Sequence, residues 1–496
     1  MVGWPAGGEP GRYAGRDARW HRGGAELRAE RRSRRGPVST ARGPGRPLDS
    51  AGGQGQTGEH SRVSFSASAW RWVLVACAVW TIGVSWLVRL PCHQLQWDGR
   101  LPYGGACYSD IPFLYARVGM VDGHFPYLVP DALLEYPVLQ SVIATVTGVF
   151  SWAITPVTSV HVAQGIYFDV NAVTIAALWA VTVLVASKMI ASPRVLLALA
   201  LAPAVAATAL INWDLWVVCV TVVALYFLRR ERWVPAGVFL GLGTALKLWP
   251  FVLLGAVIVL GIRRRELRPV VTTAVSLVAT WLVVNVPFYL WDREQWGYFW
   301  GFSSDRSAGF SSIYHVWDVA IGPALGYGEL GAGTINVIAY GGFAVLCAGI
   351  LALGLLARRE PSIEQLSLLI VAAFVLTNKV YSPQFVLWLV PLVLLARPRV
   401  VEFLIWQAIE VFHWVAIFSW LNAVSWSDES LPAWTTTYVI AVLAHVVAVA
   451  GICALVIRDV LSGRAPRDLA PDAANLGPEH QGPASTAAER RESTNA

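Results

Sequence analysis

Charged residues are scarce in this chain of 496 residues: 14% are Asp, Glu, Lys or Arg, and 55% are hydrophobic. This scarcity excludes a soluble multi-domain enzyme, and the 24 tryptophans and positive mean hydropathy indicate a polytopic membrane protein. The formal net charge of +6 does not indicate a nucleic-acid partner, because twelve Arg against six acidic residues lie within the first 65 residues. Nucleic acid is therefore not expected to bind.

The first 65 residues form a Gly-, Pro- and Arg-rich tract without apolar periodicity, which is typical of a disordered tail. The tract has neither the short apolar core nor the small-residue cleavage site of a secretory signal. We expect a basic cytoplasmic tail over 1–65, or residues ahead of the true start. A second disordered cytoplasmic tail is predicted over 462–496, which leaves a transmembrane domain over 66–461.

Several motifs are also missing. The chain contains no Walker or dinucleotide-binding glycine loop, and no spacing of His, Cys and Asp indicates a metal site. We therefore expect neither a cofactor nor a metal. The two halves show no visible repeat, which argues against a transporter built from duplicated units.

Clusters of Lys and Arg predict which ends of the apolar segments are cytoplasmic. They fall at 188–194, 229–232, 263–268, 358–359, 397–399 and 458–467. The first crossing, 70–90, follows the basic tail and should run outward. The apolar segment 137–156 is predicted to lie along or dip into the outer leaflet, because a full crossing would place the arginines at 229–230 and 263–265 outside.

The remaining apolar segments are read with the same rule. Crossings are predicted at 164–186, 195–211, 214–228 and 434–457, with others beginning near 267, 332, 363, 384 and 401. The segment 233–262 has basic clusters on both sides, so it should form two short helices that meet near Lys247 and Pro250. The result is about twelve transmembrane helices, cytoplasmic termini, and exoplasmic loops at 91–163 and 291–331.

Two of the six cysteines bracket the start of the first exoplasmic loop. Four cysteines lie in apolar segments, where a thiol is usually a small hydrophobe. Cys92 and Cys107 can form a disulfide if the loop lies outside the cytoplasm, and two unpaired thiols are the alternative.

Polar residues in or beside apolar stretches gather near the outer face in this topology. They are Asp110, Glu135, Asp169, Asn212, Asp214, Lys247, Arg306, His315, Asn378 and Lys379. Asp169 and Lys247 interrupt apolar stretches, where an ionisable group usually has a function or a partner; an ion pair between the two is the alternative. Glu410 and His413 share a helix face, either as a buried structural pair or as a second acid/base site.

An enzyme at the outer face has no ATP or sugar nucleotide available, so its expected donor is a sugar on a lipid phosphate. Transfer to a hydroxyl needs a carboxylate base and cations for the leaving phosphate. Asp110 is the candidate base, and Lys247, Arg306 and Lys379 are candidates for the phosphate. Aromatic residues in 291–318 surround Arg306 and His315; they could stack on a sugar ring or belong to the interfacial aromatic belt.

Four motifs in order resemble a known family. They are YSDI at Tyr108–Ile111, EYPVL at Glu135–Leu139, ALKLWP at Ala245–Pro250 and NKVYSPQF at Asn378–Phe385. The chain resembles, over roughly 70–458, the actinobacterial integral-membrane proteins of glycosyltransferase family 87. That family includes polyprenol-phosphate-mannose-dependent α-1,2-mannosyltransferases.

The resemblance implies an all-α GT-C fold whose large first exoplasmic loop bears juxtamembrane helices and the catalytic acid. Asp110 matches that acid by position, and Lys247 is similar to the lysine that GT-C enzymes place near the lipid phosphate. No paired acid of the D-x-D kind is present, because Tyr108 precedes Ser109 and Asp110. It is therefore open whether another acid assists Asp110 or this branch has changed its chemistry. The residues expected to support catalysis or bind the acceptor are Glu135, Asp169, Asp214, His315 and Tyr381.

The functional hypothesis is an inverting glycosyltransferase of the plasma membrane that takes a sugar, expected to be mannose, from a polyprenyl-phosphate donor. Its acceptor would be a glycolipid or cell-wall glycan, and its active site would face outside. Two other classes stay open. A transporter or flippase of a lipid-linked sugar would use the same charges, and a non-catalytic envelope scaffold would explain the single acid.

Overall fold

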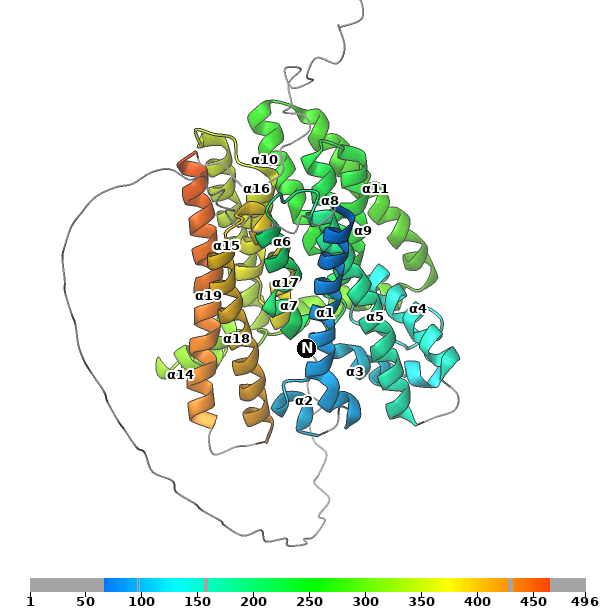
Figure 1. The fold of residues 1–496 in the computed structure, drawn as a ribbon. Helices are drawn as coiled ribbons and strands as arrows, with labels where there is room; N and C mark the ends of the chain where they lie inside the picture. Colours follow the sequence, from blue (N-terminus) through cyan, green and yellow to red (C-terminus); the bar gives the residue numbers. More distant parts are fainter. Residues whose placement is uncertain (1–66, 96, 98, 156–158, 427–430, 464–496) are drawn as a thin grey trace, which may run out of the picture. The chain divides into compact units, whose positions relative to one another are not determined.

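The computed structural model describes residues 67–95, 97, 99–155, 159–426 and 431–463. These residues form helices and connecting segments without a β-strand, which confirms the predicted all-α class for this part of the chain (Figure 1). The predicted tails at 1–65 and 462–496 lie outside the described residues, apart from Ser462 and Gly463.

Six helices in the described part of the chain are long and apolar enough to cross a membrane. They are α1 (Ala67–Gln94), α5 (Val160–Ala186), α11 (Leu267–Trp291), α15 (Ala332–Leu356), α18 (Val400–Trp426) and α19 (Leu431–Leu461). The most apolar windows of α11 and α15 are only 22% and 17% buried, so these two helices present most of their apolar side chains to the bilayer.

Shorter apolar helices pack among the long ones. They are α4 (Val138–Ile154), α6 (Pro193–Ala200), α7 (Pro203–Thr208), α8 (Asp214–Arg229), α9 (Trp233–Leu246), α10 (Leu254–Arg264), α16 (Ile363–Thr377) and α17 (Val386–Ala396). Every residue of α17 is buried, as expected of a helix that is apolar on all sides. Because several of these helices are too short to span a bilayer alone, the count of about twelve crossings stays a prediction.

The segment 195–211, predicted as one crossing, is divided in the structure. Helix α6 ends at Ala200 and α7 begins at Pro203. Proline has no N–H to donate to the preceding turn, and it favours the first position of a new helix. The structure therefore differs from the single helix predicted over 195–211, and the crossing itself stays a prediction.

The expected pair of short helices between the basic clusters at 232 and 263 is present. Helix α9 ends at Leu246, Lys247 is extended (φ −158°), and a 3₁₀ turn, η2 (Trp249–Leu253), leads into α10. Pro250 lies at the start of that turn. The break leaves the Lys247 side chain free of the helix in the interior of the bundle.

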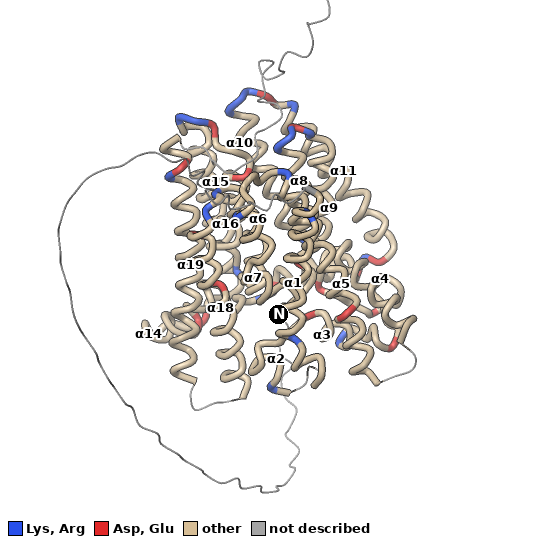
Figure 2. The backbone as a smooth tube through the Cα atoms, viewed as in Figure 1, with Lys and Arg blue, Asp and Glu red and all other residues tan. Residues whose placement is uncertain are grey.

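The two ends of the helical bundle differ in charge. Lys and Arg gather at the end of the bundle that is uppermost in Figure 2, near the label α10. The last turns of α8 and α10 both carry arginines. The opposite end carries the short helices of the two predicted exoplasmic loops (Figure 1). These are α2 (Leu101–Gly104), α3 (Asp110–Arg117), η1 (Met120–Asp122), α12 (Arg293–Asp305), α13 (Ile313–Val316), the π-turn η3 (Trp317–Ile321) and α14 (Gly322–Ala324). The 3₁₀ turn η4 (Pro383–Phe385) lies outside both loops, between α16 and α17.

Helix α9 packs against α11 through two glycines. A Cβ at Gly237 would lie 2.5 Å from the carbonyl oxygen of Thr273, and one at Gly241 would lie 2.6 Å from that of Leu277. Small residues four apart allow two membrane helices to approach this closely. The contact fixes α9, the helix that precedes Lys247, against the lipid-facing α11.

Replacing Gly241 by Leu is expected to lower the thermal unfolding temperature of the detergent-purified protein. The new side chain would meet the α11 backbone, and overpacking of this kind costs about 1–3 kcal/mol. Gly349→Leu is the matched control, because a Cβ at Gly349 in α15 meets nothing within 4 Å. Equal effects of the two substitutions in a fluorescence-monitored melt would contradict the close α9–α11 contact.

Candidate active site

Asp110 is the first residue of α3, and hydrogen bonds of the local backbone and of the neighbouring Ser109 fix its position. Ser109 caps the helix: its hydroxyl accepts from the N–H of Ile111 (3.3 Å) and donates to the carbonyl of Leu210 (2.7 Å). The N–H of Asp110 donates to the carbonyl of Ile211 (2.7 Å). The start of α3 is thus fastened to the segment between α7 and α8, and an N-terminal position also favours the carboxylate.

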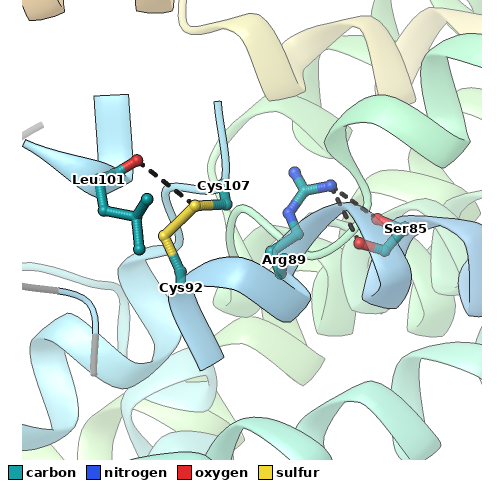
Figure 3. The surroundings of a disulfide bond; sticks show 5 residues. All are labelled: Ser85, Arg89, Cys92, Leu101 and Cys107. Atoms are coloured by element: carbon teal, nitrogen blue, oxygen red, sulfur yellow. Dashed lines mark hydrogen bonds between the residues drawn. A yellow bond between two sulfur atoms is a disulfide. The ribbon is translucent and has the colours of Figure 1, made fainter. Parts of the chain in front are cut away.

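A disulfide fastens the chain just before Asp110. Cys92 in the last turn of α1 is bonded to Cys107, with their Cα atoms 5.8 Å apart. One turn earlier, the buried Arg89 donates to Ser85 (Figure 3). Arg89 also donates to the carbonyl of Ala207 in α7, at 2.5 Å. Helix α1 therefore contacts both segments that position the carboxylate.

Two tyrosines donate to the Asp110 carboxylate, which is only 3% exposed. The Tyr108 hydroxyl lies 2.6 Å from Oδ1 and the Tyr136 hydroxyl 3.3 Å from Oδ2. Burial and the nearby Asp110 charge raise the pKa of both phenols well above the usual value. Both phenols therefore keep their protons at neutral pH and act as hydrogen-bond donors to the carboxylate.

The second acid of the site, Glu135, has a basic side chain beside it that compensates its charge. Glu135 forms an ion pair with Arg117 of α3, and its side chain is 6% exposed. Because Arg117 compensates its charge, Glu135 is suited to orient neighbouring groups of the site.

Lys247 occupies the break between α9 and η2. Its ammonium pairs with Asp214, whose side chain is fully buried at the start of α8. Three rings surround the ammonium, with centroids 5.8 Å (Tyr136), 5.3 Å (Phe385) and 5.5 Å (Trp388) away. An ammonium has three donors, so Lys247 can keep Asp214 and still bind an anion.

Arg306 and Lys379 add two further cations. Arg306 follows α12 and lies over the Phe302 ring at 5.5 Å. Burial lowers the pKa of Arg306, and the charges of nearby acids including Asp110 oppose this shift. Lys379 donates from Nζ to the carbonyl of Ser304 at 2.9 Å, so it also holds the last turn of α12 in place.

These side chains line one cavity of about 420 Å³. Its polar lining includes Asp110, Glu135, Tyr136, Asn212, Lys247, Arg306, Asn378 and Lys379, and its apolar lining includes Trp249, Phe251, Phe299, Phe302, Ala339, Tyr340, Phe343, Phe374, Phe385 and Trp388. Three cationic side chains face two carboxylates, which leaves a formal charge of +1 on the lining (3 − 2). An amphiphile with an anionic head matches this lining.

The structure brings together the candidate base, the three candidate phosphate ligands and Glu135. Asp214 is not part of the lining but pairs with Lys247, which is. Asp169 does not pair with Lys247: it accepts from Trp86 Nε1 (2.7 Å) and lies 3.1 Å from His93 Nε2. The alternative of an Asp169–Lys247 ion pair is therefore wrong.

Two other predicted residues do not line the cavity. His315 packs against the rings of Phe310 and Trp420, with centroids 5.1 and 5.4 Å away, and burial lowers its pKa. Tyr381 is buried with its ring 4.2 Å from that of His445. The structure gives neither residue a contact with Asp110.

Sequence reasoning assigned no role to the two phenols that donate to Asp110. Tyr108 lies two residues before Asp110 in the YSDI motif, so its side chain could have been considered from spacing alone. Tyr136, in EYPVL, lies 26 residues after Asp110, and only the fold brings its hydroxyl to the Asp110 carboxylate.

The model of glycosyltransferase family 87 matches residues 135–377. No match is found among curated proteins. Among solved structures, the chain is similar to ArnT from Cupriavidus metallidurans bound to undecaprenyl phosphate, at 14% identity and a TM-score of 0.38, covering 80% of this chain and 79% of that one.

Removing the Lys247 charge alone is expected to destabilise the protein. Lys247→Met leaves Asp214 buried without its cation, and breaking such a pair costs about 3–5 kcal/mol. The double variant Lys247→Met/Asp214→Asn removes both charges and should recover most of the loss. Denaturant unfolding of the single and double variants in one detergent tests this. A single variant as stable as the native protein would contradict a buried ion pair.

Proposed function

We propose that this protein is an inverting membrane glycosyltransferase with a polyprenyl-phosphate sugar as its donor. The match of residues 135–377 to the model of glycosyltransferase family 87 supports this proposal. The observation that carries the proposal is the cavity in which Asp110 faces the same space as Lys247 and Arg306. The sugar we expect from the family resemblance is mannose. The acceptor is a glycolipid or cell-wall glycan at the outer face of the plasma membrane.

The cations of the cavity suit the phosphate of the donor. Lys247 offers the donors that Asp214 does not use, and a guanidinium such as that of Arg306 binds phosphate oxygens in pairs. Charge that develops on the leaving phosphate would meet preorganised donors in a site shielded from water, where electrostatic stabilisation is strongest. Lys379 contributes a third positive charge from the neighbouring segment.

The apolar lining suits the lipid chain. Tyr340 of α15 lines the cavity and is 70% exposed, and Phe251 of η2 lines it and is 47% exposed. Both residues belong to apolar elements of the bundle, so the cavity is reached from the surface that faces lipid. A long-chain donor could enter there while its phosphate binds the cations.

The transfer step uses Asp110 as the base. The acceptor hydroxyl attacks the anomeric carbon from the face opposite the phosphate, and its proton passes to the Asp110 carboxylate. The bond from that carbon to the phosphate oxygen breaks, and the polyprenyl phosphate leaves with the electron pair. Tyr108 and Tyr136 hold the carboxylate in one orientation, which is part of the advantage of a bound geometry.

The proposed orientation of the protein in the membrane rests on the distribution of Lys and Arg. With the basic end of the bundle in the cytoplasm, both termini are cytoplasmic and the loops 91–163 and 291–331 are exoplasmic. Asp110 and Arg306 both belong to these loops, so the active site faces outside.

Asp110→Asn is expected to abolish sugar transfer, because an amide cannot accept the proton of the acceptor hydroxyl. The assay uses purified protein in liposomes with radiolabelled polyprenyl-phosphate mannose and an actinobacterial lipid extract. Asp122→Asn, an exposed carboxylate of the same loop, is the matched control and should transfer normally. Transfer by Asp110→Asn at the native rate would contradict the assignment of Asp110 as the base.

The same liposomes separate the enzyme from a transporter. An enzyme produces a new labelled glycosidic product, whereas a flippase moves the unchanged donor to the other leaflet. Labelled donor that crosses the bilayer without any new product would contradict the proposed function.

Arg306→Gln is expected to weaken donor binding. Loss of a charge-assisted contact to phosphate should raise the KM for the donor about tenfold or more. Arg293→Gln, at the exposed start of the helix that precedes Arg306, should leave the KM unchanged. An unchanged KM in Arg306→Gln, measured over a range of donor concentrations, would remove this residue from the phosphate site.

A further inference from the structure

A second cluster of chemically active side chains lies where α18 meets α19, outside the lining of the cavity. Glu410 and His413 of α18 share a helix face, as predicted, and the structure adds His445 of α19. Their exposed fractions are 3%, 1% and 0%. One potential ligand atom from each residue lies within 4.8 Å of those of the other two.

The hydrogen bonds of the cluster leave two ring nitrogens without a partner. Glu410 accepts from Trp406 Nε1 (2.7 Å) and lies 3.1 Å from His445 Nδ1. The Nε2 atoms of His413 and His445 are buried and have no hydrogen-bond partner in the described part of the chain. Buried polar atoms are nearly always paired with protein, water or an ion, so these two nitrogens require a partner.

The buried charge of Glu410 also indicates that a partner is needed. In the described portion of the chain its only ion-pair partner is His445, and no Lys or Arg contacts its carboxylate. A buried carboxylate without a full positive charge beside it is costly in a membrane interior. A bound cation would compensate this charge and would give the imidazole nitrogens a partner at the same time.

We propose that Glu410, His413 and His445 bind one divalent transition-metal ion of the Zn²⁺ class. Two imidazoles and one carboxylate form a donor set that Zn²⁺ uses in proteins. Mg²⁺ and Ca²⁺ prefer oxygen ligands and are excluded by the two histidines.

Metal binding requires the two rings to turn. The imidazoles of His413 and His445 are parallel within 6°, with centroids 4.1 Å apart, so their Nε2 lone pairs do not yet converge on one point. The side-chain torsion that turns an imidazole has broad minima, and a rotation of the rings brings both lone pairs to a common ion. The ion then replaces the parallel contact of the rings with two coordinate bonds.

The site would join α18 to α19 and support the cavity wall. The ring of Tyr381 lies 4.2 Å from that of His445, and Tyr381 stands between Val380 and Ser382, which both line the cavity. The carbonyl of Lys379 in the same segment accepts from Gly309 at 2.7 Å. An ion at the cluster would thus fix the segment that carries one of the three cations.

The test is the metal content of the whole protein. The chain is purified in detergent through a tag without histidines from cells grown with added Zn²⁺, and its metals are measured by mass spectrometry. About one Zn²⁺ per folded chain is expected. His413→Gln and His445→Gln should each lower this content about tenfold or more, and His161→Gln, an exposed histidine of α5, should not.

A second readout protects the test against variants that fail to fold. The native protein grown with Co²⁺ in place of Zn²⁺ should show the visible absorption of a four-coordinate cobalt ion. A folded native protein with neither stoichiometric Zn²⁺ nor this absorption would overturn the proposal, as would histidine variants that retain the metal. Neither readout depends on transferase activity, so failure of the metal site and failure of the proposed function are distinguishable.

Discussion

The buried ion pair between Lys247 and Asp214 is the constraint on which the site depends. An ammonium inside a membrane protein is costly unless a carboxylate compensates it, and Asp214 does so from the first turn of α8. The pair can form only because α9 stops at Leu246 and releases Lys247 from the helix. Two glycines hold α9 tightly against α11, so the position of this cation is set by packing on one side and by charge on the other.

The carboxylate opposite this cation is positioned by independent means. Asp110 is tied by backbone hydrogen bonds to the segment after α7 and by the Cys92–Cys107 disulfide to α1. The acid and the cation thus belong to separate elements, each fixed to the rigid part of the bundle. Between them lies a cavity whose polar end carries the cations and whose apolar side includes the exposed residues Phe251 and Tyr340. In the proposed transfer, groups that are already positioned in this way need no reorganisation when the reaction occurs.

The sequence predicted the positions of helices better than it predicted which side chains contact one another. Charge clusters and apolar length located the long helices and the interrupted segment at Lys247, because both signals are local. Pro203 was also visible, but the apolar run around it hid the break between α6 and α7. The alternative of an Asp169–Lys247 pair is wrong because the sequence offers more than one acid near Lys247, and only packing shows that Asp214 reaches the ammonium. Likewise, His445 joins Glu410 and His413 from another helix, so no spacing in α18 could reveal the cluster.

The most direct measurement is a cryo-electron microscopy structure in lipid nanodiscs with a phosphonate analogue of a polyprenyl-phosphate sugar, which cannot transfer its sugar. The arrangement of the cavity predicts the phosphonate between Lys247 and Arg306, the sugar directed toward Asp110, and the lipid chain leaving past Tyr340. A headgroup bound away from these cations, or a sugar that points away from Asp110, would contradict a glycosyl transfer at this site.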